Sequence, residues 1–151
     1  MQGLGDPAPW VPVLVTYLAG GPDSGLDEAF DALGGPGTQA VIGAVLGLTV
    51  TDRLGTRRDV NAIAGLVREL RAADPDPDFK PMIAEAVIRI VLGETEVRRW
   101  ISDEDFVFAG LDVGRGLLRR QHLNGEQLTE FIARVEDALR QAEAYQAGSD
   151  S

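Results

Sequence analysis

The chain of 151 residues has the length of one typical domain, and its 44% hydrophobic and 25% charged residues exclude an intrinsically disordered protein. The absence of cysteine excludes disulfides, thiolate metal sites and cysteine nucleophiles. A net charge of −10 argues against non-specific binding of nucleic acid, because such a surface repels a phosphate backbone.

The first predicted element covers residues 9–19, whose β-branched content leaves both helix and strand open. Pro12 suits the first turn of a helix better than a central strand. Ser24, followed by acids one turn later, predicts the N-cap of a short helix that runs to about Leu33. Residues 34–37, with the sequence Gly-Gly-Pro-Gly, are predicted to end it.

Two further helices are predicted before the middle of the chain. Thr38 can cap the first, which is apolar on several sides and therefore reads as a buried helix. Asp59 is predicted to cap the second, whose apolar residues between 60 and 70 follow the helical period.

The next segment holds the expected central helix of the domain. Pro81 suits a first helical turn, and a full apolar stripe follows over residues 83–92. A short turn is expected over residues 95–101. Ser102 with Asp105 resembles a capping box and begins another helix.

Asn124 is predicted to begin the last helix, whose apolar stripe spans residues 128–142 and is expected to lie against the helix over residues 83–92. We therefore expect an all-α, bundle-like single domain of six or seven helices over residues 1–147. The polar residues 148–151 are predicted to form a disordered tail.

Two glycine pairs, Gly43/Gly47 and Gly110/Gly114, stand four residues apart on apolar helices. Residues at this spacing share one helix face, so their lack of side chains permits close approach of a neighbouring helix. We interpret both pairs as close crossings inside the fold, and contact between subunits is the alternative.

The acidic connector after the third predicted helix has the spacing of a calcium loop, with Asp74, Asp76, Asp78 and Glu85 at positions 1, 3, 5 and 12. Phe79 occupies the position where such a loop needs glycine for its sharp turn. Two prolines also stiffen the connector. We therefore favour a helix-breaking turn over a metal site, and we expect no cofactor.

Catalytic candidates are few. His122 is the only histidine, lacks an assured partner and is expected at a helix end. An enzyme would have to rely on carboxylates such as Glu85, Glu94 and Asp112.

Arginine supplies 13 of the 14 basic residues, and guanidinium groups suit bidentate recognition of carboxylate or phosphate. We favour the interpretation that these arginines pair with acids inside the fold. Tryptophan and arginine are also over-represented among residues that dominate protein interfaces, although we favour a place at the edge of the core for both tryptophans. The interface candidates are Trp10, Trp100, Arg98, Arg99, Arg115 and Arg119.

The sequence also bears on location and partners. The N-terminus lacks the basic region of a signal peptide, and the longest apolar run, residues 40–50, is shorter than the roughly 20 residues of a membrane span. We expect a soluble cytoplasmic protein.

The sequence thus favours a non-catalytic interaction module that binds a partner protein or a second copy. A regulatory domain with a ligand pocket between helices is the alternative, and a carboxylate-based enzyme comes third.

Overall fold

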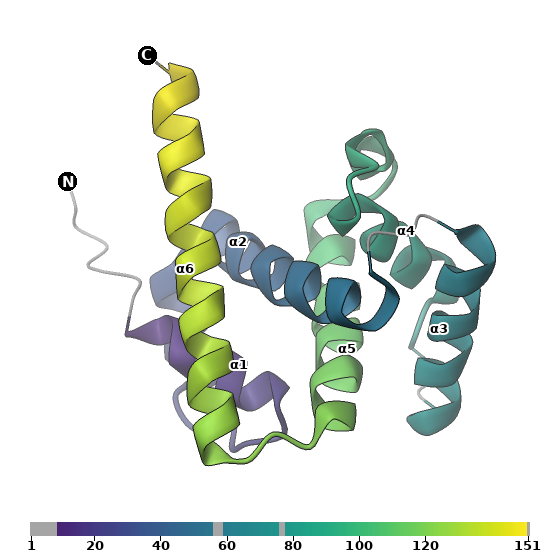
Figure 1. The fold of residues 1–151 in the computed structure, drawn as a ribbon, viewed down its shortest axis with the longest axis horizontal. Coiled ribbons are helices and arrows are strands. Elements are labelled where there is room, and N and C mark those ends of the chain that lie inside the picture. The colour runs from purple at the N-terminus through teal and green to yellow at the C-terminus, as the bar shows by residue number, and fades with distance from the viewer. Residues whose placement is uncertain (1–8, 56–58, 76–77, 151) are drawn as a thin grey trace.

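The computed structural model describes residues 9–55, 59–75 and 78–150, with side chains up to residue 144 (Figure 1). Within these ranges every regular element is a helix, so the predicted all-α fold is confirmed. The first segment, which left helix and strand open, is helical. The elements are α1 (Trp10–Leu18), α2 (Leu26–Leu54), α3 (Val60–Ala73), α4 (Pro81–Val91), the 3₁₀ helix η1 (Thr95–Trp100), α5 (Asp103–Gln121) and α6 (Gly125–Asp150).

Several predicted helix starts are present. The Asp59 carboxylate accepts a hydrogen bond of 2.9 Å from the backbone N–H two residues on, and the Ser102 hydroxyl accepts one of 3.0 Å from the N–H three residues on. Asn124 and Gln127 each accept from the backbone N–H of the other, at 2.8 and 3.0 Å. Pro81 occupies the first turn of α4. These side chains satisfy N–H groups that a helix start leaves without partners.

The start and middle of α2 differ from prediction. Ser24 does not cap the helix, because Gly25 takes the N-cap position in the left-handed conformation. Thr38 is not a cap either and lies buried inside the helix. Of residues 34–37 only Gly34 leaves helical geometry, with φ 70° and ψ 178°. The helix resumes at once, and Pro36 then stands in the first turn after the kink, where its missing N–H costs little.

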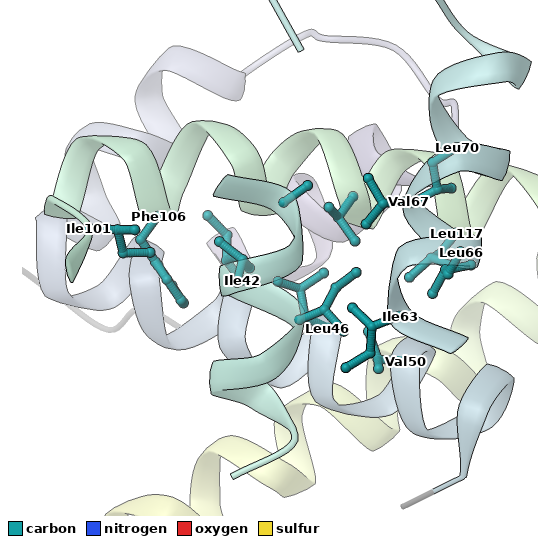
Figure 2. Close-up of a cluster of buried hydrophobic side chains, with 14 residues drawn as sticks. Ile42, Leu46, Val50, Ile63, Leu66, Val67, Leu70, Ile101, Phe106 and Leu117 are labelled. Carbon is teal, nitrogen blue, oxygen red and sulfur yellow. The ribbon is translucent and has the colours of Figure 1, made fainter. Parts of the chain in front are cut away.

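The central helix is α2, and the prediction that the segment 83–92 holds this place is wrong. One face of α2, including Ile42, Leu46 and Val50, packs with α3, α4 and α5 (Figure 2). Another face, including Val41 and Val45, packs with α1, α5 and α6. Because α2 is apolar on two faces, it contributes residues to two clusters of buried side chains, whereas α4 contributes residues to one.

The last helix, α6, packs on α1 and α2 rather than against α4 as predicted. In Figure 1 α6 and α3 stand on opposite sides of α2. Leu139 is the last residue of α6 that packs against the core, and the side chains of residues 140–144 are exposed. The helix continues to Asp150, through residues 148–150 of the predicted tail.

The two glycine pairs have different roles. A Cβ at Gly110 would come within 2.5 Å of Ile42 Cγ2, and one at Gly114 within 3.8 Å of Leu46. The predicted close crossing between α5 and α2 is therefore present at Gly110, whereas a Cβ at Gly114 would make ordinary van der Waals contact. The same prediction is wrong for Gly43 and Gly47, where an added Cβ would meet no atom of the described residues within 4 Å.

By length and composition alone α2 is also able to cross a membrane, and 44% of its most apolar window is buried in the fold. A helix that packs against buried side chains on two faces also needs a largely apolar composition.

The glycine positions yield the first prediction. Gly110→Ala is expected to lower the free energy of unfolding by about 1–3 kcal/mol, because the added methyl would collide with the Ile42 side chain. That side chain is β-branched and buried, so it cannot easily move away. Gly43→Ala is the matched control and is expected to raise stability by up to about 1 kcal/mol through helix propensity. Urea unfolding of both variants measures the difference, and equal effects would contradict the close crossing.

Candidate functional site

One face of α5 lines two adjoining cavities. The first, of about 510 Å³, lies among α1, the start of α4 and the N-terminal half of α5. The second, of about 380 Å³, lies between the end of α3 and the C-terminal half of α5. Phe79, Asp112 and Arg115 line both, so the two form one cleft along α5.

We call the first the N-terminal cavity, characterised by Tyr17, Phe79, Lys80, Ile83, Glu104 and Phe108. We call the second the arginine cavity, characterised by Leu70, Phe79, Arg115, Arg119, Arg120 and His122.

Arg115 stands at the junction of the two cavities. Its guanidinium carbon lies 5.2 Å from the centre of the Tyr17 ring, so a cation–π contact joins α5 to α1. Its Nε is buried and has no hydrogen-bond partner among the described residues. A buried N–H without an acceptor is costly, and such a group calls for an explanation in structure or function.

Arg119 follows one turn later on the same face of α5. Its side chain lies along the backbone of Gly20, which has φ +103°; a Cβ there would stand 3.7 Å from the Arg119 Nε. Arg120 reaches Glu69 of α3 at 3.8 Å. His122, expected at a helix end, is the C-cap of α5 in the left-handed conformation, with φ 50°. Neighbouring helices thus contact Arg115 and Arg120, and the turn after α1 lies beside Arg119.

The two cavities differ in charge. The N-terminal cavity is lined by four acids, Asp78, Glu104, Asp105 and Asp112, against two bases. The arginine cavity is lined by three arginines and His122 against two acids, Asp74 and Asp112. The cleft therefore runs from an acidic to a basic end on a protein whose net charge is −10.

Arg98, a predicted interface residue, makes several contacts within the fold. It donates 2.9 Å to the carbonyl of Ile101 and 3.1 Å to Gln39 Oε1 of α2. It also pairs with Asp103 and lies 5.0 Å from the centre of the Phe106 ring. One guanidinium thereby joins α2, η1 and α5.

The remaining interface candidates divide by exposure. Trp10 is half-buried and packs against the cluster shared by α1, α2 and α6, whereas Trp100 is 78% exposed. Its neighbour Arg99 is exposed as well.

Sequence reasoning missed Met82 and Phe108, which are 81% and 61% exposed. Phe108 could have been found, because Glu104 and Asp112, four residues to either side, mark its helix face as polar. An aromatic residue on a polar face is a signal in its own right.

The three carboxylates considered as catalytic candidates, Glu85, Glu94 and Asp112, do not line one cavity. Asp112 lines both cavities, which neither Glu85 nor Glu94 does. Glu94 accepts two hydrogen bonds of 3.0 Å from Arg89. These hydrogen bonds, and the charge of the same carboxylate, raise the pKa of Arg89 above its ordinary value.

The calcium-loop candidate is only partly described. Asp76 lies outside the described residues, Asp74 lines the arginine cavity, and Asp78 lines the N-terminal cavity. Glu85 lies on α4. Over the described ranges no group of three or more histidine or acidic side chains is arranged to hold a metal ion.

Comparison of the chain with protein-family models, with curated proteins and with solved structures finds no match.

Arg98 and Arg99 provide the second prediction. Arg98→Ala is expected to lower the free energy of unfolding by about 2 kcal/mol, because it removes a local hydrogen bond, and two hydrogen bonds and a ring contact that join η1 to α2 and α5. Arg99→Ala changes the exposed neighbour and is expected to act within about 0.5 kcal/mol. Urea unfolding measures both, and losses of the same size would show that Arg98 does not join these helices.

Proposed function

We propose that this protein is a non-catalytic interaction module that binds a partner protein through the segment from α4 to α5. The observation that carries the proposal is the exposure of three large apolar side chains on that segment: Met82, Trp100 and Phe108. Large exposed apolar groups are typical of protein contact sites, and tryptophan is prominent among the residues that dominate binding energy.

The surroundings of Phe108 support a specific chemistry for the partner. Ile83, in the first turn of α4, lines the same cavity as Phe108 and adds apolar surface beside it. Glu104 and Asp105 line this cavity too, and Lys80 approaches Asp105 at 3.9 Å. An apolar centre with a mainly acidic rim complements a partner segment that carries an apolar anchor flanked by lysine or arginine.

The charge of the whole chain favours a different protein over a second copy as the occupant. Two copies at −10 each repel one another, whereas a basic partner is attracted over about a Debye length. The association is therefore expected to weaken as salt rises.

The third prediction concerns a pull-down in which the tagged protein captures its partner from native cells. Trp100→Ala and Phe108→Ser are each expected to lower partner recovery about tenfold or more, as loss of an anchor side chain does. The urea midpoint should stay unchanged because both side chains are exposed. Val60→Ser is the matched control, since Val60 is 62% exposed on α3, and it should leave recovery intact.

Sedimentation velocity of the purified chain completes the test. The expected result is a monomer alone and a larger complex with the recovered partner. A strict monomer together with recovery that none of the three substitutions changes would refute the proposal.

A further inference from the structure

We infer that the arginine cavity is a binding site for a small organic anion, with a carboxylate or phosphate head and a compact apolar body. This site lies at the basic end of the cleft, and Phe108 lies at the acidic end. Arg119 stands 11 residues beyond Phe108 on α5, which is about 16 Å along a helix.

The first argument is the unusual state of two arginines. Six of the eleven described arginines form ion pairs with described acids. Arg115 and Arg119 form none among these residues, although both line a cavity. Arg119 is exposed, as are the other three without such a pair, Arg68, Arg71 and Arg99, whereas Arg115 is half-buried. Only Arg115 and Arg119 among these five line the cavity. Pairing with internal acids therefore does not account for Arg115 and Arg119.

The second argument is the way these groups are held. The Tyr17 ring supports Arg115 and Glu69 restrains Arg120, whereas Arg119 lies beside Gly20. Guanidinium groups fixed in place lose little conformational freedom when they bind an anion, and their fork geometry matches carboxylate and phosphate oxygens.

Helix polarity shows that side chains must do the binding. The arginine cavity lies at the C-terminal half of α5, where the helix dipole is negative and backbone N–H groups are already used. An anion there must be attracted by the guanidiniums of Arg115, Arg119 and Arg120. Asp74 and Asp112 offset part of their charge.

The lining of the cavity indicates the rest of the ligand. Leu70, Ala73 and Phe79 supply an apolar wall beside the cationic groups, and Gly116 adds no side chain to the space. Its volume of about 380 Å³ falls in the range of small-molecule sites. A bare inorganic anion would leave this apolar wall in contact with water, so a head group with an aromatic or short aliphatic body is the better occupant.

The fourth prediction tests this site by amide chemical-shift titration of the full-length chain with phenyl phosphate, phenylacetate, inorganic phosphate and benzyl alcohol. Phenyl phosphate, phenylacetate or both are expected to give saturable shifts around Gly116 and His122, and the tighter of the two identifies the head group. Benzyl alcohol should give none, because it carries no charge. Inorganic phosphate is expected to bind about tenfold more weakly, because it leaves the apolar wall uncovered.

Matched double variants separate the site from general surface charge. Arg115→Gln with Arg119→Gln should weaken binding about tenfold or more, since it removes two charge-assisted contacts. Arg68→Gln with Arg99→Gln removes the same charge from exposed positions and should change binding less than twofold. Arg119→Gln alone keeps the Arg115–Tyr17 contact and serves if the first double variant fails to fold.

Absence of saturable shifts up to about 10 mM of either organic anion would overturn the inference. So would equal losses in the two double variants, or inorganic phosphate binding as tightly as the organic anions. Trp100→Ala should leave anion binding unchanged, so failure of this site and failure of the partner surface are distinguishable.

Discussion

The close contact between α2 and α5 is the constraint on which the other positions in the fold depend. At Gly110 no side chain separates the two helices, and the Ile42 methyl fills the space that a Cβ would need. α2 packs on one side with α3 and α4 and on another with α1 and α6. The position of α5 against α2 therefore also sets the distance from α5 to α1 and α3, the helices that flank the cleft.

Sequence predicted most features of the fold that depend on neighbours in the chain, but not the caps at Ser24 and Thr38. Helix periodicity and the caps at Asp59, Ser102 and Asn124 are local, because each cap joins residues two or three apart. The central position of α2 and the outward face of Gly43 depend on which helices meet in space. Glycines four apart look alike whether a helix covers them or not, so composition could not distinguish Gly43 from Gly110.

At the candidate site, too, sequence could not predict what depends on contacts in space, as two arginines illustrate. Arg98 and Arg115 are the same residue type on or near helices, yet Arg98 bonds Gln39, which is 59 positions away, and Arg115 lies over Tyr17 beside a cavity. Arg115 and Arg119 are four residues apart on α5 and line the same cavity. Their spacing could not show which face of α5 the other helices leave open. Phe108, on that same open face, carried a local signal that a stricter analysis of helix faces would have found.

The polarity of the cleft follows from the physics of one helix. Acids in the first turn of α5, Asp103 to Asp105, and arginines in its last turns both stabilise the helix against its dipole. Because one face of α5 is open along its length, this arrangement also gives the cleft an acidic end and a basic end. Helix stability alone accounts for Arg119 and Arg120, which stand in the last turn. It does not account for Arg115, which lies farther inside α5 with a buried Nε that lacks an acceptor. The residue that helix stability leaves unexplained is therefore the one on which an anion site depends most.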